Sequence, residues 1–352
     1  MSQSKGNLKN ILVVRTDRIG DVILSLPIAR IIKEHLPGCK VTFLVREYTF
    51  ELVKHHPFID DVLTLKEIDG DVDLKSNITM IKENGFDSAI TVYPTFKTSL
   101  MIFLSKIPLR IGTGYRWYSM LFNSKVYEHR KDAKKHELEY NVGMLKNIGI
   151  DINVTNKNVK FDLNPADEAD RFINNLLKEQ YISSEEPLII IHPGSGGSSI
   201  DLPVNKYVEI VKNLTEKFSV KILVTGLEKE KFICSQLVLN DNVKNLAGKL
   251  TLSQMIALTS RAKLFIANST GTIHIAAALN IPAIGFYPKI PACSANRWGP
   301  YSDKSIVFSP QIDCNKCTRE QCGQLDCMNT INTNDVIVSA QKILNLVEKN
   351  GD

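Results

Sequence analysis

Residues 265–282, F-I-A-N-S-T-G-T-I-H-I-A-A-A-L-N-I-P, combine an apolar run, a polar turn and an Ala-rich helical pattern. The turn frees backbone N–H groups at the start of a helix, where the helix dipole also favours negative charge. Further donors are available from the side chains of Asn268, Ser269, Thr270, Thr272 and His274, and Gly271 lies within the turn. This set of groups suits a phosphate or diphosphate. The alternative is a capped strand-to-helix turn that binds nothing.

A second loop of the same kind lies about 75 residues earlier. The run P-L-I-I-I-H-P at residues 187–193 contains His192 and precedes a loop of Gly194, Ser195, Gly196, Gly197, Ser198 and Ser199. Glycines let a backbone approach an anion closely, and successive N–H groups form a concave nest. The loop is neither G-x-G-x-x-G nor a P-loop. Because open α/β sheets bind ligands at the carboxyl ends of their strands, the two loops together predict a phosphate site.

A carboxylate marks a third turn near the start of the chain. Residues 11–14 are apolar, residues 15–20 form a polar turn, and a helical pattern is expected to begin at Asp21. An aspartate there can cap the helix, which stabilises it by about 1 kcal/mol. It can also act as a general base. The residues alone leave both interpretations open.

The elements that must position these loops alternate between strand and helix. Seven short apolar runs read as buried strands: residues 11–14, 41–45, 88–92, 188–192, 221–225, 264–267 and 283–286. Helical patterns follow most of them, which predicts an α/β fold of βαβ units with parallel sheets. At 352 residues, two domains are expected, at 1–175 and 176–330, with the change near residues 165–186. A final amphipathic helix within 331–352 is expected to pack back on the domain junction.

Composition and charge limit where the protein is expected to act and which classes of partner it is expected to bind. The chain is 43% hydrophobic, has no run of 18 apolar residues, and starts without the apolar core of a signal peptide, so we expect a cytoplasmic protein. Residues 106–136 hold eight Lys and Arg against two acidic residues, interleaved with aromatic ones. Such a segment suits an anionic acceptor or a phospholipid surface, or it is a solvated basic face. No nucleic-acid motif is present, so nucleic acid is not an expected partner.

Two segments suggest metals. Cys314, Cys317, Cys322 and Cys327 lie within 14 residues, which is consistent with structural zinc, an iron–sulfur site or a loop of reduced cysteines. The spacing is irregular for a zinc ribbon. Asp69 and Asp71 form D-x-D, which holds a metal on a nucleotide diphosphate in some glycosyltransferases. An exposed acidic loop is the preferred interpretation there, and no catalytic metal is expected.

Taken together, the loops resemble glycosyltransferase family 9, the ADP-heptose:lipopolysaccharide heptosyltransferases. The likeness covers R-T-D-R-I-G-D-V-I-L-S-L-P, I-H-P-G-S-G-G-S-S, N-S-T-G-T-I-H-I-A-A-A-L and the stretch at residues 285–301. The resemblance implies a GT-B architecture, in which two Rossmann-like domains face each other across a cleft. The amino-terminal domain would bind an anionic glycolipid acceptor and the carboxy-terminal domain a nucleotide sugar, ADP-heptose. Transfer would invert the anomeric centre without a metal. Peripheral contact with the cytoplasmic face of the inner membrane stays open.

The resemblance also implies roles for individual residues. Asp21 is the expected general base. Ser269, Thr270, Gly271 and His274 would contact the diphosphate, with the loop around Gly194 completing the site. Glu228 would bind the ribose hydroxyls, and Leu250 would pack on the base. The residues expected at the acceptor are Arg18, Arg116, Lys134, Lys135 and His136.

One position departs from the family pattern. The family usually has a Lys three residues before the Pro that follows the glycine loop, and this chain has Ile200 there. A cation on the leaving diphosphate is therefore missing, unless Arg18, Lys206, Lys289 or Arg297 replaces it. Two alternatives stay open: another nucleotide-sugar enzyme, such as a UDP-sugar transferase or a 2-epimerase, and a non-catalytic nucleotide-sugar-binding paralogue.

Overall fold

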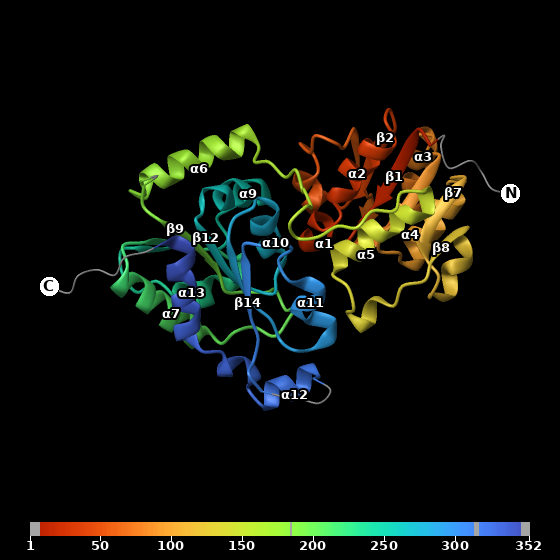
Figure 1. Cartoon of the computed structure of the whole chain (residues 1–352). Helices are drawn as coiled ribbons and strands as arrows, with labels where there is room; N and C mark the ends of the chain where they lie inside the picture. The colour runs from red at the N-terminus through yellow and green to blue at the C-terminus, as the bar shows by residue number, and fades with distance from the viewer. Residues whose placement is uncertain (1–7, 184, 313–316, 346–352) are drawn as a thin grey trace. The chain divides into compact units, whose positions relative to one another are not determined.

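The computed structural model describes residues 8–183, 185–312 and 317–345 (Figure 1). The chain forms two compact units: unit 1 contains residues 1–130 and 137–163, and unit 2 contains residues 131–136 and 164–352. The division at 163/164 comes earlier than the 175/176 boundary predicted from the sequence. The predicted boundary falls inside helix α6 (Asp167–Glu179), which packs on α9 (Leu252–Arg261) of unit 2.

Unit 1 is built on a six-stranded parallel sheet of order β3-β2-β1-β6-β7-β8. Its strands are β1 (Asn10–Val14), β2 (Lys40–Val45), β3 (Asp61–Thr64), β6 (Ser88–Thr91), β7 (Leu109–Thr113) and β8 (Ser124–Val126). Its α-helices are α1 (Ile19–Ile23), α2 (Pro27–His35), α3 (Leu74–Glu83), α4 (Phe96–Leu104) and α5 (Glu137–Gly143). A small antiparallel hairpin of β4 (Glu67–Ile68) and β5 (Asp71–Val72) precedes α3.

Unit 2 repeats this plan, with the sheet order β11-β10-β9-β12-β13-β14. Its strands are β9 (Leu188–His192), β10 (Lys221–Val224), β11 (Val243–Asn245), β12 (Leu264–Asn268), β13 (Ala283–Phe286) and β14 (Ser305–Phe308). Besides α6 and α9, its helices are α7 (Val204–Lys217), α8 (Lys231–Ser235), α10 (Gly271–Ala278), α11 (Ala295–Trp298), α12 (Arg319–Gln324) and α13 (Thr333–Leu344). Both sheets therefore have the 3-2-1-4-5-6 strand order of a Rossmann fold.

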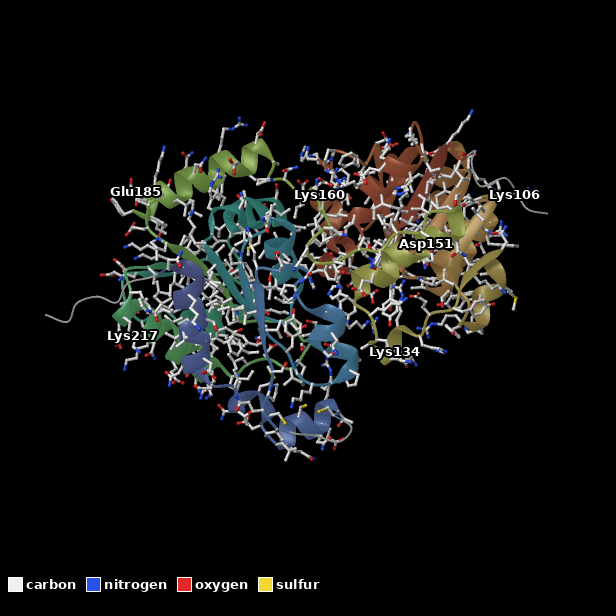
Figure 2. All side chains as sticks on the ribbon, in the orientation of Figure 1. Lys106, Lys134, Asp151, Lys160, Glu185 and Lys217 are labelled. Atoms are coloured by element: carbon white, nitrogen blue, oxygen red, sulfur yellow. The ribbon has the colours of Figure 1, made fainter. Side chains whose placement is uncertain are left out.

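The core explains why the central strands form. Residues of β1, β9 and β12 are almost all buried, as expected for parallel strands covered on both faces. Side chains of α7 and α13 fill one side of the unit 2 sheet, and the two helices lie next to each other (Figures 1 and 2). The predicted α/β class with parallel sheets is confirmed. Within the described residues, no helix is long and apolar enough to cross a membrane.

Candidate active site

The turn after β1 in unit 1 is organised by a fully buried arginine. Arg15 donates from Nη2 to Oδ1 of Asp21, its Nε lies 2.8 Å from Oδ1 of Asp17, and its Nη2 lies 3.6 Å from Oε1 of Glu137. Burial alone would lower the pKa of Arg15, but the three carboxylates raise it above its ordinary value. Arg15 is therefore a fixed positive charge around which three carboxylates gather.

The capping interpretation of Asp21 is wrong. Helix α1 begins at Ile19, and its N-cap position is Arg18, so Asp21 already lies in the first turn. Its Oδ1 accepts from Arg15, and within the described chain its Oδ2 accepts no hydrogen bond. The side chain is partly exposed. Asp21 is thus held in place by one oxygen and presents the other, which is the geometry a general base needs.

Two further carboxylates around Arg15, Asp17 and Glu137, were not singled out from the sequence. Burial raises the pKa of Asp17 to about 7, opposed by the charge of Arg15 and reinforced by the negative charges of Asp21 and Glu137. The hydroxyl of Tyr48 donates to the backbone carbonyl of Asp17 at 2.5 Å. Asp17 belongs to the same polar turn as Asp21, so local pattern could have found it. Glu137 comes from α5, and no local signal links it to this turn.

In unit 2, the two predicted phosphate loops leave neighbouring parallel strands. His192 ends β9 beside Ala267 of β12, so both loops start at the same sheet edge. Ser198 donates from Oγ to the carbonyl of Ser269 at 3.0 Å. Asn268, which is fully buried, donates to the carbonyl of Pro193 and accepts from the N–H of Leu202 at 2.9 Å. These bonds join segments that are about 70 residues apart in the sequence, at the point where the strand order reverses.

The glycines of the first loop are required by its geometry. Gly196 and Gly197 have φ values of +60° and +82°, a backbone region that residues other than glycine rarely adopt. A Cβ on Gly194 would lie 2.1 Å from Oε1 of Glu230. Glu230 is buried, accepts from the N–H of Gly196 at 3.1 Å and from that of Leu227 at 2.8 Å, and so fixes the loop. Sequence reasoning missed this residue, because Glu230 lies between β10 and α8, far along the chain from the loop that it contacts.

Several donors on these loops are buried and have no protein partner. In the described part of the chain, the hydroxyls of Ser199 and Thr272 and Nδ1 of His274 lack hydrogen bonds. Burial lowers the pKa of His274 to about 3, and the charge of His136 adds to that effect, so the ring is neutral at pH 7. Burial likewise lowers the pKa of His192 to about 4, and its Nδ1 lies 2.9 Å from Oγ1 of Thr225. Unpaired buried polar atoms gathered on two loops are consistent with a polar ligand.

The predicted ribose and base residues follow β10 and β11, two neighbouring strands of the unit 2 sheet. Glu228 follows β10, and its carboxylate rests against Gly248, where a Cβ would lie 1.9 Å from Oε2. Leu250 is partly buried two residues further on and precedes α9. The N–H of Gly248 also donates to the carbonyl of Gly226 at 2.9 Å. The structure therefore places Glu228 against the segment that leads to Leu250.

The predicted acceptor residues are divided between the units. Arg18 and Arg116 are exposed on unit 1, whereas Lys134 and Lys135 are exposed on the segment assigned to unit 2. Lys134 is labelled in Figure 2, and its Nζ lies 3.9 Å from Oδ2 of Asp132. His136 differs from the others because it is buried: its Nε2 lies 2.8 Å from the carbonyl oxygen of Gly299. His136 thus belongs with His274 rather than with an exposed basic patch.

The departure at Ile200 has a clear structural consequence. Ile200 is partly buried and packs against apolar side chains of unit 2, among them Ile290 and Cys322. A different cation reaches the glycine loop: Nη2 of Arg319, from the start of α12, donates to the carbonyl of Ser198 at 2.7 Å. Both Nη atoms of Arg319 lie 3.4 Å from the carbonyl oxygen of Gly197. Arg319 was not among the four cations considered from the sequence.

The two suggested metal segments also have structural roles. Cys322 and Cys327 are buried with Ile290, and Cys293 and Cys317 pack against them, while Cys314 lies outside the described residues. Burial raises the pKa of Cys322 to about 11, and the neighbouring Cys327 and Cys317 add to the shift. Asp71 is ion-paired with Lys97, and Asp69 lies in the exposed β4–β5 turn. Among the described residues, no group of three or more His, Cys, Asp or Glu side chains is arranged to hold a metal ion.

Comparison with known proteins decides the family. The model of glycosyltransferase family 9 (heptosyltransferase) matches residues 76–327, which is more than half of the chain. This protein belongs to glycosyltransferase family 9. It is therefore a glycosyltransferase, and the resemblance found in the sequence motifs is confirmed.

Individual relatives extend the family match to most of the chain. A putative glycosyltransferase of Haemophilus influenzae is 29% identical over 86% of this chain and 90% of that protein. Lipopolysaccharide heptosyltransferase 2 of Salmonella typhimurium is 25% identical over 79% and 82%. The structure of Escherichia coli ADP-heptose lipopolysaccharide heptosyltransferase II aligns with a TM-score of 0.77 at 21% identity, over 96% of this chain and 98% of that one. The fold of this family 9 protein is accordingly of the GT-B type, with two Rossmann-like units.

Proposed function

We propose that this protein transfers a heptosyl group from ADP-heptose to the saccharide of a lipopolysaccharide core or a related glycan. The names of its relatives support the donor and the kind of acceptor. The observation that carries the proposal is the joining of the two loops of unit 2 by Ser198 and Asn268, with buried donors left unpaired on them. In this proposal, transfer takes place in the cytoplasm, at the membrane surface that holds the acceptor.

Unit 2 would bind the donor and stabilise the leaving group. ADP gains negative charge as the bond between its phosphate oxygen and the anomeric carbon breaks. The N–H groups at the start of α10, the neutral ring of His274 and the loop at Gly194–Ser198 are donors suited to that charge. Glu228 would accept from the ribose hydroxyls, and Leu250 would pack on adenine. Because backbone donors and Arg319 supply the stabilisation, no metal is needed.

Unit 1 would supply the base. The acceptor hydroxyl must lose its proton as its oxygen bonds to the anomeric carbon, and Oδ2 of Asp21 would take that proton. Oδ1 stays bound to Arg15, which fixes the direction of the carboxylate. The oxygen enters on the face opposite to the departing ADP, so the anomeric configuration inverts. Exposed cations such as Arg18, Arg116, Lys134 and Lys135 would attract an anionic glycolipid.

A donor screen tests this proposal. The purified protein is incubated with a lipopolysaccharide-core acceptor and either ADP-heptose or UDP-sugars, and nucleoside diphosphate release is measured with and without EDTA. We expect release of ADP only, unaffected by EDTA, and a product of inverted configuration by NMR. Release of UDP would replace the proposed donor. Loss of turnover in EDTA, restored by Mg²⁺, would return Asp69 and Asp71 to the site. Tight ADP binding without turnover on any acceptor would indicate a non-catalytic paralogue.

A further inference from the structure

A stretch of unit 1 contains no acidic residue. Residues 88–127 are forty residues without Asp or Glu, and they include five cations: Lys97, Lys106, Arg110, Arg116 and Lys125. The chain as a whole has 38 acidic residues in 352, so about four would be expected in a stretch of this length. The stretch contains α4 and the 3₁₀ turn η2 (Trp117–Leu121), which contact each other. Lys97 pairs with Asp71 of the β4–β5 hairpin, and the other four cations leave the stretch with a net positive charge.

Helix α4 is apolar on its outer side as well as its inner side. On its inner side, Met101 and Ile102 of the helix are buried. On its outer side, Phe96, Phe103 and Leu104 are each about 40% exposed. These three positions are spaced i, i+7 and i+8, so they share one face of the helix. A surface helix normally presents polar residues there. The outer face of α4 thus lacks the polar residues of an ordinary solvent-exposed helix.

Two larger side chains extend this face. Trp117 is 70% exposed and Met120 is 74% exposed, both on η2. The ring of Trp117 stacks on that of Phe96, with centroids 4.8 Å apart. We call the set Phe96, Phe103, Leu104, Trp117 and Met120 the α4–η2 surface. It joins exposed apolar side chains from two elements, which marks an interaction site more often than scattered single residues do.

Cations surround this surface. Lys106 follows the end of α4 and is exposed (Figure 2), Arg116 directly precedes Trp117, and Cζ of Arg110 lies 5.3 Å from the ring centre of Phe103. Exposed Trp and Phe with flanking Lys and Arg form the combination that binds the headgroup region of a bilayer. Basic residues gain about 1 kcal/mol each near an anionic leaflet, roughly a fivefold effect on binding. A neutral or basic protein partner would not use this charge.

We propose that the α4–η2 surface binds the unit to an anionic phospholipid bilayer. Helix α4 follows β6, and β6 pairs with β1, whose carboxyl end leads to Arg15 and Asp21. The amino-terminal end of the surface, at Phe96, therefore starts at the sheet edge that carries the proposed base. The inference gives the proposed function its membrane partner and rests on that function only for the lipid-linked acceptor. The lipid contact itself depends on the exposed residues alone.

Vesicle binding tests this proposal directly. The full chain is sedimented with vesicles of phosphatidylcholine alone or with 30% phosphatidylglycerol. We expect binding to the anionic vesicles, at least tenfold weaker binding to the neutral ones, and loss of binding at high salt. Trp117→Ser with Met120→Ser should weaken anionic binding about tenfold or more. Phe232→Ser is the matched control, because Phe232 is 78% exposed on α8 of unit 2, and it should bind as the wild type does.

Tryptophan fluorescence gives a second measurement of lipid binding, made on a protein that keeps all five residues of the α4–η2 surface. The chain has two tryptophans, and in a Trp298→Phe variant only Trp117 emits. Its emission should shift to shorter wavelength and be quenched by brominated lipid when anionic vesicles are added. An unshifted spectrum, or equal binding by the Trp117→Ser/Met120→Ser variant, would overturn the proposal. A dimer in light scattering that this double variant dissociates would overturn it too, by assigning the surface to a second copy.

The lipid contact and the enzymatic activity can fail separately. With a delipidated, water-soluble acceptor saccharide, the Trp117→Ser/Met120→Ser variant should transfer sugar at the wild-type rate. On acceptor embedded in anionic vesicles, it should be slowed about tenfold. A protein that binds vesicles but transfers to neither acceptor would contradict the proposed function and leave the membrane surface standing. If the Trp117→Ser/Met120→Ser variant transfers sugar to both acceptors as fast as the wild type does, the proposed membrane surface is contradicted instead.

Discussion

Arg319 donates from Nη2 to the carbonyl of Ser198 at 2.7 Å and connects the start of α12 to the glycine loop of unit 2. The same loop residue reaches the second phosphate loop through its hydroxyl, which donates to Ser269. A cation is therefore fixed on the segment that would surround the diphosphate. It stands close to where the family's usual Lys is absent, because Ile200 lies only two residues from Ser198.

Replacement of Arg319 should weaken nucleotide binding. Arg319→Gln removes the charge but retains a donor, so we expect about tenfold weaker ADP binding by calorimetry, the loss typical of one charge-assisted contact. Arg319→Lys should recover part of the affinity. Arg171→Gln, on the exposed side of α6, is the matched control and should leave affinity unchanged. A lower melting temperature with unaltered ADP affinity would show that Arg319 only braces the loop.

Restoring the family's Lys should not tighten nucleotide binding. The side chain of Ile200 packs against apolar residues near Ile290 and Cys322, so Ile200→Lys places an ammonium group in that environment. We expect a loss of about 1–3 kcal/mol of unfolding free energy in urea, with ADP affinity within threefold of wild type. Ile200→Met is the control, since it keeps the volume and should cost less than about 1.5 kcal/mol. Tenfold tighter ADP binding would mean that residue 200 can turn toward the diphosphate.

Loss of the proposed base should separate turnover from donor binding. Asp21→Asn keeps an oxygen for Arg15 but cannot take a proton, so transfer should fall about 10²–10⁴-fold. ADP affinity should stay within twofold, because the donor loops belong to unit 2. Asp69→Asn, an exposed carboxylate in the β4–β5 turn, should transfer normally. If Asp21→Asn has a kcat within a few-fold of wild type, Asp17 becomes the better candidate for the base.

The sequence predicted the parts of the fold that are buried on both sides. β9, with L-I-I-I-H, reads as a strand because a central parallel strand has apolar residues on both faces. The strands that were missed, among them β7 (L-R-I-G-T) and β11 (V-K-N), lie toward the sheet edges, where charged residues and short length remove that signal. Edge strands are set by pairing with a neighbour, and a single sequence does not reveal the pairing.

The candidate site follows the same division. The loops after β9 and β12 were predicted because their donors are consecutive in the sequence. Glu137 and Glu230 were missed because each reaches its partner across the fold: Glu137 is 122 residues beyond Arg15, and Glu230 is 34 residues beyond Gly196. The start of α1 was misplaced by two residues, because the charged Arg18 occupies the cap position with no side-chain capping bond. The turns that carry the candidate side chains were readable from the sequence, and the contacts that position those side chains were not.

The buried carboxyl of Asp17 should make the stability of the protein depend on pH. Its pKa is raised to about 7 in the folded chain, mainly by burial, against an ordinary value of 3.8. Between about pH 4 and pH 7 the folded state therefore binds more protons than the unfolded state, and stability must fall as pH rises through this window.

The variant Asp17→Asn tests this dependence, because its side chain cannot ionise and the variant therefore does not lose stability in this way as the pH rises. The linkage gives a loss of about 2–3 kcal/mol in wild type between pH 5 and pH 8. The melting-temperature difference between Asp17→Asn and wild type should therefore be about 5–10 °C larger, in favour of the variant, at pH 8 than at pH 5. Asp61→Asn, at the exposed edge strand β3, should differ from wild type by the same amount at both pH values. If the Asp17→Asn difference is also the same at both values, Asp17 is ionised throughout, and Arg15 holds all three of its carboxylates as anions.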